Sequence, residues 1–130
     1  MRVVIDTNVL VSALISANGT PAKILAALLN DKITILYDNR IIFEYLKILS
    51  RDIFKFDNEV INELIIYIHH KGEYINADYS KVKFEDEIDK KFYEVFKTGF
   101  AGFLITGNKK HFPKEKEIIA PKEFFETAFP

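Results

Sequence analysis

The 130-residue chain is expected to fold as an α/β three-layer sandwich with a central, mostly parallel sheet. Short apolar, β-branched runs alternate with longer segments of helical periodicity along the whole sequence. Each intervening segment is long enough to reconnect two parallel strands. No internal repeat, low-complexity tract or Gly/Ser-rich linker interrupts this alternation, so residues 1–130 are expected to form a single domain.

Strands are predicted where apolar or β-branched residues run together between turn signals. The first is Val3-Val4-Ile5 within residues 2–5, which ends at Asp6. The later ones are 33–37, a short extended piece at 74–75, 103–106 before the Gly107-Asn108 turn, and 118–119.

Helices are predicted where apolar residues recur at spacings of three and four behind a capping residue. A short helix over 9–15 comes first, and a loop over 17–20 follows it. The next helix starts with Thr20 as N-cap and Pro21 in the first helical position, and ends at 30–32. The remaining helices are one capped by Asp38 or Asn39 and reaching Leu49, one from Asp57 or Asn58 to Gly72, one from the acidic run 85–89 to Gly99, and one starting at Pro121.

Composition excludes several classes of function. The chain has no cysteine, which rules out a disulfide framework and thiolate chemistry. No apolar run is long enough for a membrane span and the N-terminus lacks signal-peptide features, so a cytoplasmic protein without membrane attachment is expected. The net charge of −1 argues against nucleic-acid binding through bulk charge alone, but it is compatible with an acidic metal site beside a local basic groove.

Three acidic residues occupy comparable positions in this expected topology. Asp6 ends the first strand, Glu44 lies in the first turns of the helix after the second strand, and Asp89 begins the helix before strand 103–106. Strand carboxyl ends and the helix N-termini that follow them share one edge of a parallel sheet, where ligands bind. Asp6 and Glu44 are therefore expected to meet, and Asp89 joins them if its helix starts at the same edge.

Such a set has the ligand chemistry of Mg²⁺ or Mn²⁺. Glu44 lies between Phe43 and Tyr45, so its carboxylate should be partly shielded and need a partner. Each acid also has an ordinary explanation. Asp6 can be a helix cap, Glu44 a solvated helix residue, and Asp89 part of an acidic run that complements the helix dipole.

Several motifs occur in the order found in one known family. The opening Val-Val-Ile-Asp6-Thr-Asn-Val-Leu, the segment Asp89-Lys-Lys-Phe, the turn Thr106-Gly-Asn and the ending Ile-Ile-Ala-Pro121-Lys-Glu-Phe resemble PIN domains, which are metal-dependent ribonucleases. Within that superfamily the chain is similar to the VapC-like toxins of toxin–antitoxin systems. The resemblance spans the whole chain, although it is vague between residues 50 and 84.

This resemblance implies a set of site residues. Asp6, Glu44 and Asp89 fall on the family's metal-binding acids and are the catalytic candidates, with Asn108 as a fourth metal position that contributes no charge. The candidates for supporting or orienting these metal-binding side chains are Thr7, Asn8, Asp86 and Thr106. Candidates for contact with RNA phosphates are Arg40, Lys109, Lys110 and His111.

The implied function is hydrolysis of RNA phosphodiesters by water activated on Mg²⁺ or Mn²⁺, which leaves a 5′-phosphate. The implied partners are single-stranded RNA, a cognate antitoxin protein and, as a further option, a second copy of the chain. Two alternatives remain open: a non-catalytic interaction module with the PIN fold, and a housekeeping RNA-processing nuclease. A phosphate-accepting receiver domain fits poorly, because no Lys stands at the end of a late strand.

Overall fold

The computed structural model describes all residues, 1–130, and contains a five-stranded sheet and six α-helices. In chain order the elements are β1 (Arg2–Ile5), α1 (Thr7–Ile15), α2 (Thr20–Leu29), β2 (Thr34–Tyr37), α3 (Asn39–Leu49), the 3₁₀ helix η1 (Asp52–Phe54), α4 (Asn58–Lys71), β3 (Glu73–Tyr74), α5 (Glu87–Thr98), β4 (Phe103–Ile105), the 3₁₀ helix η2 (Lys109–His111), β5 (Ile118–Ile119) and α6 (Pro121–Ala128). The predicted fold class is confirmed.

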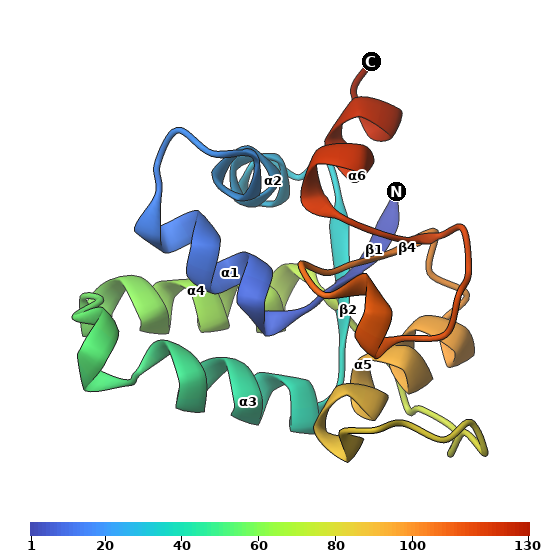
Figure 1. The fold of residues 1–130 in the computed structure, drawn as a ribbon. Helices are drawn as coiled ribbons and strands as arrows, with labels where there is room; N and C mark the ends of the chain where they lie inside the picture. Colours follow the sequence, from blue (N-terminus) through green and yellow to red (C-terminus); the bar gives the residue numbers. More distant parts are fainter.

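The sheet is entirely parallel and has the strand order β3-β2-β1-β4-β5. Figure 1 shows α1 to α4 on one side of the strands and α5 on the other. Helix α5 packs against β1, β2 and β4, while α6 packs against β4 and α2. Because the connections leave from the same edge of the sheet, the residues that follow β1, β2 and β4 gather there.

The central strand β1 is buried on both faces, as expected for a parallel sheet covered by helices. Val3, Val4 and Ile5 are completely inaccessible to solvent. Val3 pairs with Ile35 of β2, and Ile5 pairs with Ile105 of β4. This register fixes the position of Asp6, directly after Ile5, at the carboxyl edge of the sheet.

Buried aromatic residues attach α3 and α5 to the end of β1. The hydroxyl of Tyr45 in α3 donates a hydrogen bond to the carbonyl of Ile5. Its ring lies 6.4 Å from that of Phe92 in α5, measured between centroids. The N-terminal halves of α3 and α5 therefore converge where β1 ends (Figure 1).

Helix starts agree with the capping residues in the sequence, with one correction. Asp38 caps α3 by accepting from the N–H of Ile41 at 3.0 Å, and Asp57 caps α4 by accepting from the N–H of Glu59 at 2.8 Å. The prediction that Thr20 caps its helix is wrong. Gly19 is the N-cap of α2, Thr20 is already helical, and no side chain caps this end.

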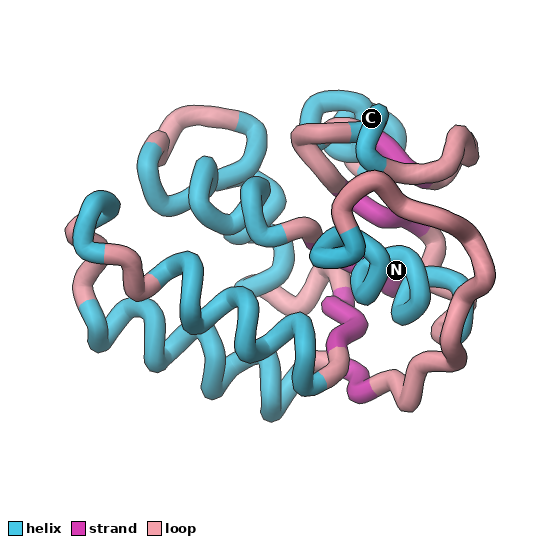
Figure 2. Tube along the Cα trace, turned by 60° about the horizontal axis from the view of Figure 1, so that its bottom comes forward, coloured by secondary structure: helices cyan, strands magenta, loops and turns pink.

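Figure 2 shows α3 and α4 running side by side away from the strands, joined by a short connection that includes η1. The sequence did not predict η1. Lys55 ends it with a left-handed backbone (φ 54°), and the rings of Phe54 and Phe56 stack with centroids 5.2 Å apart. This connection brings Phe54 to the wall of the cavity described below.

No single helix is long and apolar enough to cross a membrane, and only the α1–α2 pair, bent by 102°, would meet the criteria of length and composition together.

Gly72, between α4 and β3, has no room for a side chain. A Cβ there would lie 2.5 Å from the carbonyl oxygen of Ile68 and 2.9 Å from that of Ile35. Replacing Gly72 by Ala should therefore lower the free energy of unfolding by about 3 kcal/mol, since two backbone groups would have to move. Gly19→Ala is the matched control, because its Cβ would meet nothing closer than 3.6 Å. Urea denaturation of both variants is the measurement. Equal midpoints for the two would contradict the expectation.

Candidate active site

Asp6 lies at the carboxyl edge of the sheet and is only 6% exposed. Although it occupies the N-cap position of α1, its carboxylate makes no capping hydrogen bond. Instead, Oδ2 of Asp6 accepts from the hydroxyl of Thr106 at 2.7 Å and from the amide of Asn8 at 3.3 Å. Simple helix capping therefore does not explain this buried carboxylate.

Thr106 and Asn8 also connect the ends of β1 and β4. The Thr106 hydroxyl accepts from the backbone N–H of Asn108 at 3.0 Å, and Oδ1 of Asn8 accepts from the N–H of Gly107 at 3.1 Å. The turn after β4 is therefore bonded to the segment after β1, and both polar side chains hold Asp6 in one orientation.

Glu44 projects from the second turn of α3 toward the same edge. Its side chain is 15% exposed, in agreement with the expectation that its apolar neighbours shield it. It accepts a hydrogen bond from the hydroxyl of Thr7, and its Oε1 forms an ion pair of 2.6 Å with the ammonium of Lys91.

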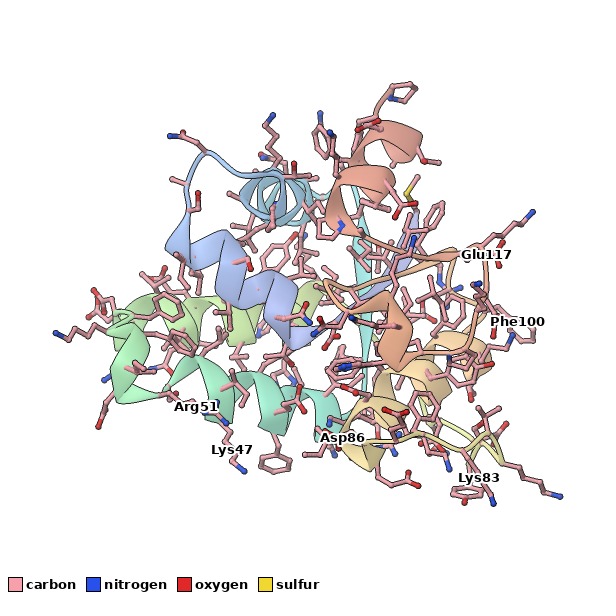
Figure 3. All side chains as sticks on the ribbon, viewed as in Figure 1. Lys47, Arg51, Lys83, Asp86, Phe100 and Glu117 are labelled. Carbon is pink, nitrogen blue, oxygen red and sulfur yellow. The ribbon has the colours of Figure 1, made fainter.

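Asp89 is the one member of the acidic run 85–89 that reaches the acids of the neighbouring elements. It lies in the first turn of α5, its side chain is 17% exposed, and Nδ1 of His111 approaches Oδ2 of Asp89 to 3.4 Å. Asp86 is the N-cap of α5 and accepts from the N–H of Ile88 at 3.0 Å. Figure 3 labels Asp86 at this end of the helix.

The three acids surround one cavity of about 400 Å³, hereafter the acid cavity. It is lined by Asp6, Thr7, Asn8, Val11, Ser12, Glu44, Ile48, Phe54, Ile88 and Asp89. Asp89 also borders a second cavity of about 280 Å³, hereafter the side cavity, lined by residues 82–86, Asp89 and residues 110–113. Asp86 thus faces the side cavity and not the acid cavity.

Asn108 is connected to Asp6 through the hydroxyl of Thr106, but it does not line the acid cavity. It lines a separate cavity of about 230 Å³ together with Asn8 and Gly107. Its backbone N–H is used by Thr106, as described above, and the residue begins η2. Asn8 and Ser12 line both this cavity and the acid cavity, so the predicted fourth metal position lies beside the acid cavity but is not part of its lining.

Burial and neighbouring acidic groups raise the pKa of Asp6 and of Asp89. Burial and the neighbouring charges of Asp89 and Glu44 raise the pKa of Asp6 to about 6, although the hydrogen bond from Thr106 opposes this shift. Burial also raises the pKa of Asp89, with Asp86 and Glu44 adding to the shift and His111 and Lys91 opposing it. A buried carboxylate with an elevated pKa near other acids is typical of a functional site.

The donor set fits a small divalent cation, because carboxylate oxygens are the ligands that Mg²⁺ and Mn²⁺ prefer. Asp6, Glu44 and Asp89 would hold such an ion at the acid cavity. In the present arrangement no three acidic or histidine side chains form a ready-made metal-binding group. Asp6 and Glu44 are instead held by the protein donors Thr106 and Lys91, and Nδ1 of His111 lies 3.4 Å from Asp89.

The basic residues predicted to contact RNA have different environments. Lys110 and His111 line the side cavity beside Asp89. Nζ of Lys109 is paired with Glu123 at 2.8 Å. Arg40 forms ion pairs of 2.7 Å with both Asp38 and Glu94, which are buried, so its guanidinium already serves two carboxylates.

Sequence reasoning missed Lys91 and Glu94. Lys91 lies two positions after Asp89 in the motif Asp-Lys-Lys-Phe but received no role. Glu94 is 4% exposed and also accepts from the N–H of Ser80 at 2.7 Å, which holds the segment before α5. Its spacing of four residues from buried Lys90 was the available signal, since residues four apart share a helix face.

Acidic side chains line one cavity at the carboxyl edge of a covered parallel sheet, which is the edge where ligands bind in open α/β folds. The PIN domain family model matches residues 2–110, so the chain belongs to the PIN domain family. PIN domains are in general nucleases, and they typically use divalent metal ions.

One curated relative is 32% identical over 142 aligned positions, covering 97% of this chain and 90% of its own length. It is described as the uncharacterized protein MJ1680 of Methanocaldococcus jannaschii. No solved structure gives a significant match to the chain.

Proposed function

We propose that the chain is a Mg²⁺- or Mn²⁺-dependent endoribonuclease in which Asp6, Glu44 and Asp89 hold the metal, and that residues 1–130 act as one PIN-like domain. The observation that carries the proposal is the acid cavity, which is lined by carboxylates from the end of β1, from α3 and from α5. Family membership adds the nuclease class. A bound divalent ion would supply Lewis acidity toward the scissile phosphate and lower the pKa of a water molecule.

The chain's own residues orient this site. Thr106 and Asn8 fix the carboxylate of Asp6, and Thr7 fixes that of Glu44. Such hydrogen bonds restrict the rotation of a metal-binding carboxylate and increase its affinity. Asn108 lines another cavity, so we propose it as a residue that shapes the turn and not as a direct ligand.

RNA would enter beside Asp89, because the side cavity places Lys110 and His111 next to that acid. Their positive or hydrogen-bonding groups can meet phosphate oxygens without reading bases. Arg40 and Lys109 are weaker candidates, since acidic partners already engage them.

Cleavage of a generic single-stranded RNA tests the proposal directly. The purified protein should cleave it with Mg²⁺ or Mn²⁺, and chelation should abolish cleavage. Asp89→Asn should lower the rate by about 100-fold or more, as removal of one electrostatic group from an active site does. Asp57→Asn is the matched control, because it replaces one good helix cap by another at the start of α4. Full cleavage by Asp89→Asn, or by the chelated protein, would contradict the assignment.

A non-catalytic interaction module is the second candidate, favoured by the ion pair that Lys91 makes with Glu44. Such a module would neither take up Mn²⁺ nor cleave RNA, so calorimetric titration with Mn²⁺ separates the two.

The biological role that we propose is that of a cytoplasmic toxin restrained by an antitoxin, with a homodimer as its own assembly. The sequence resemblance to VapC-like toxins supports this role. Expression of the wild-type chain, but not of Asp6→Asn, should arrest growth. A housekeeping RNA-processing nuclease with the same site would cleave RNA without arresting growth.

A further inference from the structure

Lys91 is a half-buried cation in direct contact with one of the three acids. Its side chain is 12% exposed, and its Nζ lies 2.6 Å from Oε1 of Glu44. The same ammonium donates to the carbonyl of Ile88, another residue at the wall of the acid cavity. Both contacts hold Lys91 at the convergence of α3 and α5. Ammonium groups shielded in this way require a compensating charge.

The pairing changes the charge that the cavity presents to a metal ion. Of the three carboxylates, Glu44 is neutralised by Lys91, which leaves Asp6 and Asp89. Two negative charges match one divalent cation. Asn108 contributes no charge and lines a different cavity. No fourth acid therefore replaces the negative charge of Glu44 that Lys91 neutralises.

His111 is the other basic side chain near the acids, but its position is different. Its ring nitrogen lies 3.4 Å from Asp89, and its side chain is 47% exposed. Water screens an exposed pair far more than a buried one. Lys91 is therefore the cation that a metal ion would meet as a fixed part of the site.

We propose that Lys91 is a built-in monovalent cation of the site, which neutralises Glu44 and thereby limits the acid cavity to one divalent ion. This inference rests on the proposed metal-dependent function. Lys91 is a positioning residue in this role: it acts through Glu44 and transfers no proton. Its effect is on the number of metal ions bound and on their affinity.

Mn²⁺ titration calorimetry on four proteins tests the inference. The wild type should bind one Mn²⁺. Lys91→Met should bind a second ion, or bind the first about tenfold or more tightly, because a positive charge within a few ångströms has been removed. Lys91→Arg keeps the charge and should behave as the wild type. Lys97→Met is the matched control, since it removes an exposed lysine of the same helix that pairs with Glu115.

The outcomes separate the inference from the function. If the wild type binds Mn²⁺ and Lys91→Met binds it with unchanged or weaker affinity and the same stoichiometry, the role of Lys91 is overturned while the proposed function stands. If only Lys91→Met binds Mn²⁺, the stated limit of one ion is contradicted and the natural chain lacks its proposed metal. If neither protein binds Mn²⁺, both proposals fall. Thermal denaturation checks folding, and Lys91→Gln, which retains two N–H donors, replaces Lys91→Met if that variant does not fold.

Discussion

Replacing Asp6 by Asn should abolish metal-dependent cleavage and at the same time stabilise the metal-free protein at neutral pH. Asp6 is buried, and its pKa is raised to about 6 by burial and by the charges of Asp89 and Glu44. Asparagine keeps the shape and an oxygen that can accept from Thr106, but it carries no charge. The substitution therefore removes a metal ligand and a destabilising buried charge together.

The pH dependence has a definite sign. The pKa of Asp6 is higher in the folded state than its ordinary value of 3.8, so between about pH 4 and 6 the folded protein binds more protons than the unfolded chain. The free energy of unfolding of the wild type should fall as the pH rises through this window and then level off. Above pH 6 the ionised carboxylate costs up to about 3 kcal/mol, at 1.36 kcal/mol per pKa unit.

Urea denaturation in the presence of a chelator, at several values from pH 4 to pH 8, measures this effect. Asp6→Asn should exceed the wild type in stability at pH 7, and the difference should vanish near pH 4. Asp57→Asn is the matched control, because it makes the same chemical change at an exposed helix cap. Added Mn²⁺ should then stabilise the wild type and Asp57→Asn, but not Asp6→Asn. If the free energy of unfolding depends on pH in the same way for Asp6→Asn and the wild type, the raised pKa of the buried Asp6 carboxylate is refuted.

Replacing Arg40 by Ala should lower the free energy of unfolding by about 3 kcal/mol, the lower part of the range for breaking a buried ion pair. Its guanidinium pairs at 2.7 Å with Asp38 and with Glu94, whose side chains are 8% and 4% exposed. Truncation would leave both carboxylates without their cation. The effect stays below the maximum because the Arg40 side chain is itself 49% exposed.

Arg51→Ala is the control for charge removal near the same helix, because Arg51 is exposed; Figure 3 labels it at the far end of α3. In thermal or urea denaturation, the free energy of unfolding of Arg40→Ala should be about 3 kcal/mol lower than that of Arg51→Ala. If Arg40→Ala is as stable as Arg51→Ala but binds RNA less tightly, Arg40 contacts substrate and does not serve as a structural cation.

Local patterns predicted the elements well because each begins and ends with its own chemical signal. The apolar run before Asp6 identified β1, and Asp38, Asp57 and Asp86 each cap a helix in the structure. The predicted capping role of Thr20 was wrong because Gly19, the residue before it, is the N-cap of α2. The connection that forms η1 carries no comparable signal, since its left-handed residue is a lysine.

The site was predictable only in part. Topology placed Asp6 and Glu44 at one edge, and the structure adds Asp89 to the same cavity. What a sequence does not contain is the rotation of each helix about its axis. That rotation turns Asp89 and Lys91 toward Glu44 while Asp86 faces the side cavity. It also decides that Glu94 meets Arg40, a pairing across 54 positions of the chain.

The two outer strands of the sheet, β3 and β5, are each only two residues long. A strand this short offers too few free N–H and C=O groups to serve as a template for another chain, which protects the molecule against edge-to-edge aggregation. Some peptide-binding domains recognise a partner by pairing an extended peptide with a sheet edge. The short edges of this sheet therefore do not support that mode of binding. Any protein partner must instead dock on side chains presented by helices and loops.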